Sequence, residues 1–141
     1  MIRRMTAADA GAVADIWLAA NLDAHGFIPA DYWRGCQSAV REAIAGAEVY
    51  VYEGPEGIEG FIGLEGEHIA GLFVRSGSRS RGLGHALLEA ARAGRAGLSL
   101  SVYEKNAPAR RFYEREGFRF AGRGVDGNTG ETELAMVWRR A

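Results

Sequence analysis

Apolar residues recur along the first third of this chain with the period of an α-helix. Val13, Ile16, Trp17 and Ala20 follow the i, i+3, i+4, i+7 spacing that places side chains on one helix face. The residues before them, Thr-Ala-Ala-Asp at 6–9, have the form of a capping box. We expect this helix to break at Asn21 and a second one to run from Pro29 to Gly46, since proline suits a first helical turn.

The period then changes from helical to the short apolar runs of strands. A first strand is expected at 2–5, and three more at 48–53, 58–64 and 68–74. The last three are separated only by turns rich in glycine. Consecutive strands joined by such turns favour an antiparallel meander. The apolar run that ends strand 68–74, Leu72, Phe73 and Val74, predicts that this strand is buried.

Helical spacing returns at Leu83, Leu87 and Leu88, and that helix should end among Gly94–Gly97. A fifth strand at 98–102 is expected to lie parallel to strand 68–74, because the intervening helix crosses over. A further helix is expected at 106–116. Two final strands, at 118–123 and 132–138, are expected on either side of a turn at 126–130. The complete order is β-α-α-β-β-β-α-β-α-β-β. The predicted class is α/β (α+β), with a mixed, mostly antiparallel central sheet of about seven strands flanked by about four helices.

Composition narrows the class of protein. The chain has 141 residues, 48% of them hydrophobic, and a net charge of −1, which suits one domain over 1–141 and shows no basic stripe for nucleic acid. Cys36 is the only cysteine, so no disulfide forms within the chain and no metal-ligand set is apparent. Without a signal peptide or membrane-spanning run, we expect a cytoplasmic protein without a membrane partner.

A segment rich in glycine, serine and arginine lies between strand 68–74 and the helix at Leu83. Strand, flexible loop and helix start form the geometry in which backbone N–H groups face an anion. Gly82 and Gly84 leave no side chain in the way, and Arg79 and Arg81 add positive charge. A dinucleotide-binding fingerprint would need glycine at position 87, which is leucine. The common nucleoside-triphosphate loop would need a Gly-Lys-Ser/Thr triplet, which does not occur. We interpret the segment as a binding site for a diphosphate, and an ordinary solvated turn is the alternative.

Two motifs carry a resemblance to a known family. Arg79-Ser80-Arg81-Gly82-Leu83-Gly84 resembles the acetyl-coenzyme A (acetyl-CoA) loop Arg/Gln-x-x-Gly-x-Gly/Ala of the GNAT superfamily of N-acetyltransferases. Asn106 to Phe118 is similar to that superfamily's Asn-x-x-Ala-x-x-Phe-Tyr-x-x-x-Gly-Phe signature. The element order matches as well, and several stretches look like a bacterial peptidyl-lysine N-acetyltransferase of this group.

The resemblance implies an enzyme that transfers acetyl from acetyl-CoA to a primary amine by direct attack in a ternary complex. The cofactor would be bound by three groups of residues: the loop and helix start, the end of strand 68–74, and the helix at 106–116. They are Arg79, Ser80, Arg81, Gly82, Leu83, Gly84 and His85, then Leu72, Phe73 and Val74, then Asn106, Phe112 and Tyr113.

The resemblance also implies catalytic roles. Tyr113 matches the family's general acid, which protonates the leaving thiolate. His68 is the candidate general base, in competition with Glu104, Glu67 and a water relay. A structural tyrosine at 113 and a strand-end histidine at 68 are the alternatives.

The amine that accepts the acetyl group is what the sequence defines least. His25, Phe27 and Tyr32 are expected to bind this acceptor amine, or else to pack between the first two helices. A protein lysine is one acceptor, and a polyamine, amino acid or antibiotic is another. A non-catalytic acyl-CoA sensor is the alternative from a different class. Monomer and homodimer both remain open.

Overall fold

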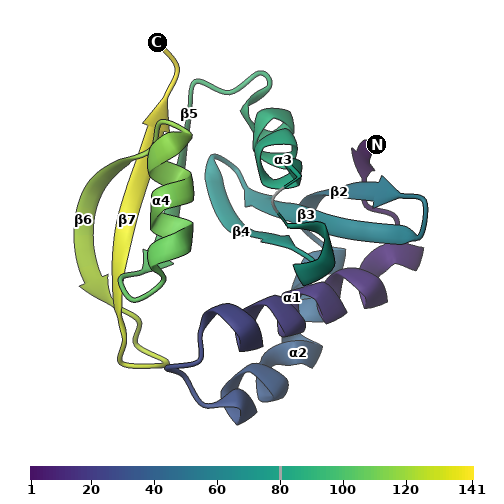
Figure 1. The fold of residues 1–141 in the computed structure, drawn as a ribbon, viewed down its shortest axis with the longest axis horizontal. Coiled ribbons are helices and arrows are strands. Elements are labelled where there is room, and N and C mark those ends of the chain that lie inside the picture. The colour runs from purple at the N-terminus through teal and green to yellow at the C-terminus, as the bar shows by residue number, and fades with distance from the viewer. Residues whose placement is uncertain (80) are drawn as a thin grey trace.

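The computed structural model describes residues 1–79 and 81–141. Its centre is a seven-stranded sheet in the order β1-β2-β3-β4-β5-β7-β6 (Figure 1). The strands are β1 Ile2–Arg4, β2 Glu48–Gly54, β3 Gly57–Glu65, β4 His68–Val74, β5 Gly97–Tyr103, β6 Arg119–Val125 and β7 Thr132–Arg139. The helices are α1 Ala10–Ala24, α2 Ala30–Ala45, α3 Leu83–Arg92 and α4 Ala107–Arg115. β4 and β5 are parallel and the other neighbouring pairs are antiparallel, which confirms the predicted fold class.

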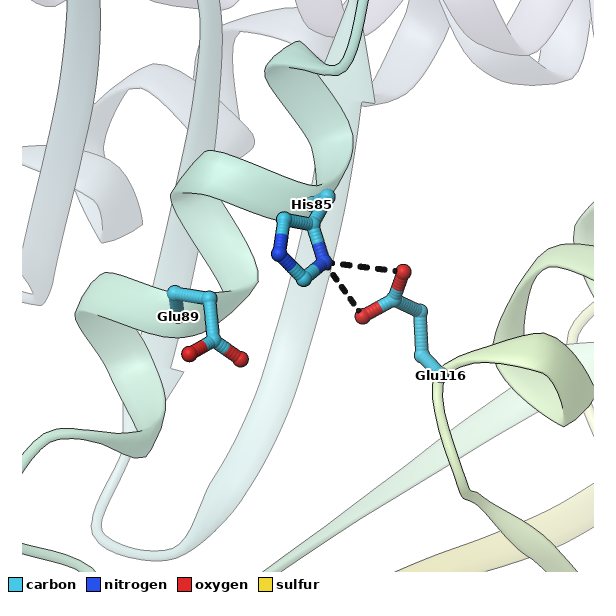
Figure 2. Close-up of side chains that lie close together, drawn as sticks. All are labelled: His85, Glu89 and Glu116. Atoms are coloured by element: carbon cyan, nitrogen blue, oxygen red, sulfur yellow. Dashed lines mark hydrogen bonds and ion pairs between the residues drawn. The ribbon is translucent and has the colours of Figure 1, made fainter.

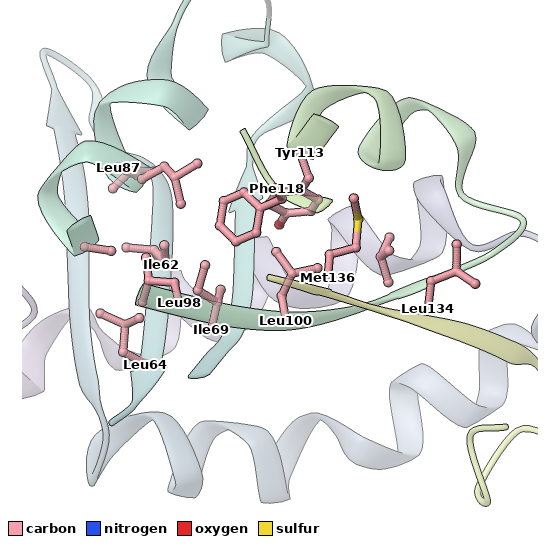
Figure 3. Close-up of a cluster of buried hydrophobic side chains, with 13 residues drawn as sticks. Ile62, Leu64, Ile69, Leu87, Leu98, Leu100, Tyr113, Phe118, Leu134 and Met136 are labelled. Atoms are coloured by element: carbon pink, nitrogen blue, oxygen red, sulfur yellow. The ribbon is translucent and has the colours of Figure 1, made fainter. Parts of the chain in front are cut away.

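The helices cover both faces of the sheet with separate hydrophobic cores. α3 and α4 pack on one face over a core that includes Ile62, Leu87 and Leu88, each fully buried (Figure 3). α1 and α2 pack on the other face over Val13 and its buried neighbours from β2 and β3. Apolar side chains lie on both faces of β3: its neighbouring residues Phe61 and Ile62 are both buried, each in a different one of the two cores.

The sheet opens between β4 and β5. Only two register pairs join these strands, His68 with Ser99 and Ile69 with Leu100, although β4 continues to Val74. On the other side of β4, Ile69 faces Leu64 and Gly71 faces Gly63, so Ala70 is an extra, bulged residue. A bulge bends its strand and increases the local twist. β4 therefore turns away from β5, and the two parts of the sheet diverge (Figure 1).

The first helix departs from the prediction at its end. It was expected to break at Asn21, but α1 continues through Ala24. Asn21 stays helical because its side-chain amide donates a hydrogen bond to the Trp17 carbonyl (2.8 Å). At the start, a 3₁₀ turn at Ala7–Asp9 precedes α1, and the Asp9 carboxylate accepts the Thr6 N–H (2.8 Å), as the capping-box pattern predicts.

Within the described residues, the helices are all too short or too polar to cross a lipid bilayer.

Candidate active site

A pocket of about 760 Å³ lies where β4 and β5 separate. Its walls are the end of β4, the start of α3, α4 and the end of α1. Most of the residues that the sequence assigned to the cofactor line it: Leu72, Phe73, Val74, Arg79, Gly82, Leu83, Gly84, His85, Asn106, Phe112 and Tyr113. Arg81 does not, and Ser80 lies outside the described residues. Segments far apart in the sequence thus meet at one cavity.

One wall of the pocket is the apolar end of β4, whose side chains are only half-buried. Leu72, Phe73 and Val74 are all partly exposed, whereas Phe61 and Ile62, their partners on β3, are buried. The sequence predicted a buried strand here, which is wrong for these three residues. The reason is that β5 has already diverged, so the β4 edge beyond Ile69 has no strand partner on that side among the residues that the structure describes.

The N-terminus of α3 forms the polar end of the pocket. Gly82 is its N-cap residue and has φ +78°, a left-handed conformation that glycine adopts without strain. Glycine has no side chain to accept hydrogen bonds from the first N–H groups of the helix. Those N–H groups and the helix dipole favour an anion at this end.

Gly84 serves a different purpose. A Cβ at this position would lie 3.2 Å from the Phe112 ring. Glycine therefore allows α3 and α4 to approach each other at the pocket. Both glycines were expected to leave space for an anion. Of the two, Gly82 has the backbone conformation that requires glycine, and Gly84 makes room for Phe112.

The two arginines of the loop are held by carboxylates. Arg79 pairs with Asp23 at the end of α1, and Arg81 pairs with Glu59 on β3. Glu59 also accepts a hydrogen bond from the Ser78 hydroxyl (2.8 Å), and this bond together with Arg81 lowers its pKa. Both arginines were expected to add positive charge to the anion site. Arg79 lines the pocket, and Arg81 does not. Both side chains of the Arg79–Asp23 pair are exposed, so this pair is weak enough to exchange for another anion.

Tyr113 lies at the junction of the pocket and the main core. Its side chain is 8% exposed and packs edge-on against Phe112, with ring centroids 5.2 Å apart. It packs in the same way against Phe118 at 5.5 Å (Figure 3). It also lines the pocket. Burial raises the pKa of Tyr113, because the ionised phenolate would be desolvated. The hydroxyl therefore keeps its proton at neutral pH.

Three polar side chains link α1 to α4 through buried hydrogen bonds. His25 Nδ1 lies 2.8 Å from Asn21 Oδ1, and the Asn106 side-chain amide lies 3.1 Å from His25 Nε2. An amide oxygen only accepts and an amide nitrogen only donates, so His25 carries its proton on Nδ1 and accepts at Nε2. Asn106 also caps α4, where its Oδ1 accepts the Ala109 N–H (3.3 Å).

His25 is thus a buried, neutral histidine with both ring nitrogens engaged. It is 8% exposed, and burial lowers its pKa to about 4. From the sequence, His25 was expected to bind the amine that accepts the acetyl group. The structure places it at the pocket wall, where its hydrogen bonds fix the orientation of Asn106.

The structure does not bring His68 or Glu104 to the pocket. His68 is at the start of β4, where its Nδ1 lies 2.9 Å from Ser99 Oγ. It is six residues from Val74, about 20 Å along an extended strand. Glu104 lies nearer in sequence, but its carboxylate pairs with Arg123 at 2.6 Å. Neither side chain is among the described residues of the pocket wall.

Phe27 and Tyr32 belong to an aromatic cluster beside the pocket rather than to its wall. Phe27 and His25 both pack against Tyr103, with ring centroids 5.7 and 4.9 Å away. Tyr32 packs against Trp33 at 4.9 Å. The Tyr103 hydroxyl contacts Asp126 Oδ2 at 2.5 Å, which ties the cluster to the β6–β7 loop.

Sequence reasoning missed one charged group at the pocket. His85 Nδ1 lies 2.8 and 3.0 Å from the two carboxylate oxygens of Glu116, with Glu89 beside them (Figure 2). Arg92 Nη1 contacts Glu89 at 2.7 Å and Glu116 at 3.2 Å. The guanidinium contacts both carboxylates, so Arg92, Glu89 and Glu116 form an ion-pair network between α3 and the end of α4. Which groups Glu116 contacts depends on how the two helices pack, so the sequence did not reveal this network.

Known proteins resemble this chain in sequence over nearly its full length. The family model described as acetyltransferase (GNAT) domain matches residues 45–120. The peptidyl-lysine N-acetyltransferase YiaC of Escherichia coli K12 is 34% identical over 140 residues, which are 98% of this chain and 96% of YiaC. The chain belongs to the GNAT acetyltransferases. The predicted family and the predicted N-acetyltransferase enzyme are thereby confirmed.

Solved structures agree with the GNAT assignment. The peptidyl-lysine N-acetyltransferase YjaB of E. coli K12 is 31% identical over 86% of this chain and 84% of its own. The solution structure of its apo form aligns with a TM-score of 0.88 at 28% identity, over 100% of this chain and 98% of that one. The structure of yncA from Salmonella typhimurium, with its cofactor acetyl-CoA, has the same fold (TM-score 0.67, 21% identity, 99% and 92% coverage). At this identity the likeness shows the fold, and acetyl-CoA is the cofactor of that relative.

The buried state of His25 makes a prediction for stability. The pKa of His25 is about 4 in the folded protein against an ordinary value of 6.5, so the unfolded chain binds more protons between these values. Its contribution is complete above about pH 6.5 and is lost as pH falls towards 4, by about 3 kcal/mol in all. His25→Gln should remove this part of the pH dependence in urea unfolding followed across that range. Identical pH slopes for the two proteins would contradict the assignment.

Proposed function

We propose that this protein transfers the acetyl group of acetyl-CoA to the ε-amine of a protein lysine. The observation that carries the proposal is that Tyr113, the N-terminus of α3 and the unpaired end of β4 share one pocket. YiaC and YjaB, the relatives with 34% and 31% identity, are both named peptidyl-lysine N-acetyltransferases. Nothing about the pocket favours a small-molecule amine over a lysine side chain, so small amines enter as arms of the test.

The shape and chemistry of the pocket fit acetyl-CoA. Its volume of about 760 Å³ is within the range of pockets for ligands of this size. The first N–H groups of α3 would hold the diphosphate, and Arg79 would exchange Asp23 for it. The half-exposed apolar side chains of Leu72 and Phe73, and the free strand edge that carries them, would lie along the pantetheine arm.

Bound acetyl-CoA supplies a thioester carbonyl that an amine attacks directly, with the thiol as leaving group. Tyr113 would donate a proton to the leaving sulfur, for which its protonated state suits it. A backbone N–H of β4 would stabilise the charge that develops on the carbonyl oxygen. Asn106, fixed by the Ala109 N–H and by His25, would orient the arm or Tyr113.

The amine must also lose a proton before it attacks. Since His68 and Glu104 lie away from the described pocket wall, we propose the water relay in place of a single side-chain base. Of the acidic pocket residues, Glu116 is held in an ion pair by Arg92. Asp23 pairs with Arg79 only until the diphosphate replaces it, so water would pass the proton to the released Asp23 carboxylate or out along the open side of the pocket. A cytoplasmic location, and the choice between monomer and homodimer, stay predictions.

A thiol-release assay tests the proposed function. The protein is incubated with acetyl-CoA and, in separate arms, with lysine-containing peptides, the same peptides with arginine in place of lysine, polyamines and free amino acids. We expect thiol release with the lysine peptides and none with the arginine controls. Release only with small amines would replace the acceptor, and binding of acetyl-CoA without turnover in any arm would identify a sensor.

The role of Tyr113 is tested by Tyr113→Phe. The substitution removes one hydroxyl and keeps the ring packed against Phe112 and Phe118. Because the hydroxyl would act only on the leaving group, kcat should fall by about a hundredfold while KM for acetyl-CoA is unchanged. Tyr52→Phe on β2, away from the pocket, is the matched control. Equal kcat values for all three proteins would exclude Tyr113 from catalysis.

The left-handed conformation of Gly82 gives a prediction for cofactor binding. Alanine at this position costs about 1–2 kcal/mol in that conformation, so the free loop of Gly82→Ala should relax away from it. CoA binding must restore the conformation, and Kd should rise about 5- to 30-fold. Gly77→Ala in the same loop is the control, since a Cβ there meets no atom and φ is not positive. Titration calorimetry measures both; equal affinities would show that the Gly82 amide geometry is not used.

A further inference from the structure

Lys105 is the only lysine of the chain. The sequence has 17 basic residues, and every other one is arginine. This single lysine lies between the end of β5 and the start of α4, directly before the α4 cap residue Asn106. It is also one of the residues that line the pocket. The protein thus places its one ε-amine at its own active site.

The Lys105 side chain crosses from one acceptor-side loop to the other. Its Nζ lies 5.4 Å from the ring centroid of Phe27, in the loop between α1 and α2. On the other side it pairs with Glu131 Oε1 at 3.0 Å, in the segment between β6 and β7. The side chain is 59% exposed, so the ammonium is held by two weak contacts and is not buried.

The reacting centre is within reach of this side chain. Tyr113 lies seven residues after Asn106 on α4, which is about 10 Å along the helix axis. Helical side chains lean towards the N-terminus of their helix, so the Tyr113 hydroxyl points back towards Asn106 and shortens that separation. The four-carbon stem of a lysine spans most of what remains. When Lys105 leaves Glu131, its amine can enter the pocket from the side that an acceptor would use.

We propose that Lys105 is acetylated by its own active site, within the same molecule. This inference rests on the proposed function, because it uses the same reaction. The Lys105 ammonium gives up one proton, for which the Glu131 carboxylate is the adjacent acceptor. The neutral Nζ then attacks the acetyl carbonyl and the N–C bond forms. The C–S bond breaks as the sulfur takes the Tyr113 proton, and the second proton of the attacking nitrogen passes to the Tyr113 oxygen, directly or through water, which restores the hydroxyl. The product is a neutral amide and free CoA.

Acetylation would change the two contacts that Lys105 makes. The amide has no charge, so it loses both the ion pair with Glu131 and the cation–π contact with Phe27. The modification would therefore release the link between the two loops that border the acceptor side of the pocket. It would occur when acetyl-CoA is abundant and acceptors are scarce.

The test uses intact-protein mass spectrometry after incubation with acetyl-CoA and no added acceptor. The only amines of the chain are Lys105 and the α-amine of Met1, so peptide mapping assigns the acetyl group without ambiguity. We expect one acetyl group, on Lys105, with a rate per molecule that does not change on tenfold dilution of the protein. Lys105→Arg should remain unlabelled at position 105, and Tyr113→Phe should slow the labelling about a hundredfold.

A parallel arm with a lysine peptide separates this inference from the proposed function. If the peptide is acetylated and Lys105 is not, self-acetylation is wrong and the proposed function stands. If neither is acetylated, the proposed function fails as well. Equal labelling of wild type and Tyr113→Phe would indicate uncatalysed chemical acetylation. A rate that rises with protein concentration would indicate transfer between molecules. Either result overturns the proposal.

Discussion

The lack of pairing between β4 and β5 beyond Ile69 is the constraint on which the site depends. A strand edge inside a domain carries backbone N–H and C=O groups that need partners. β4 satisfies one edge with β3 and leaves the other free from the Ala70 bulge onwards. The same divergence leaves Leu72 to Val74 half-exposed and makes room for the pocket. A single extra residue in one strand thus produces both the cavity and the hydrogen-bonding edge that lines it.

The gap between β4 and β5 has to stay open and unfilled, and contacts between the helices keep it open. Gly84 permits α3 to lie against Phe112 of α4, so the two helices meet at one end of the gap. At the other end the Asn21–His25–Asn106 hydrogen bonds connect α1 to the cap of α4. A neutral histidine suits this task, because it donates at one nitrogen and accepts at the other. Protonation of His25 would place a second donor against the Asn106 amide.

Much of this architecture could be predicted from sequence because the relevant signals are local. The Leu83–Leu88 spacing, the capping box at 6–9 and Pro29 at the start of α2 each act within a few residues, and the confirmed fold follows from the order of such elements. The burial of Leu72, Phe73 and Val74 could not, since it depends on whether a distant strand stays paired. The parallel arrangement explains why His68 lies away from the pocket. Parallel strands place their C-terminal ends at the same end of the sheet, and β4 and β5 separate at that end. His68 begins β4 at the opposite end.

Ion pairs account for the rest of what sequence reasoning could not reach. Arg81 with Glu59 and Glu104 with Arg123 join residues on different elements, and each pair removes a charged group from the role that its motif or position suggested. Arg79 pairs as well, but with Asp23, an exposed residue at the pocket wall, so an anion in the pocket competes directly for it. Position alone therefore does not decide which charges are available to a ligand. What decides it is whether the existing partner lies at the pocket or behind it, and by that criterion Arg79 is the loop arginine that the site can use.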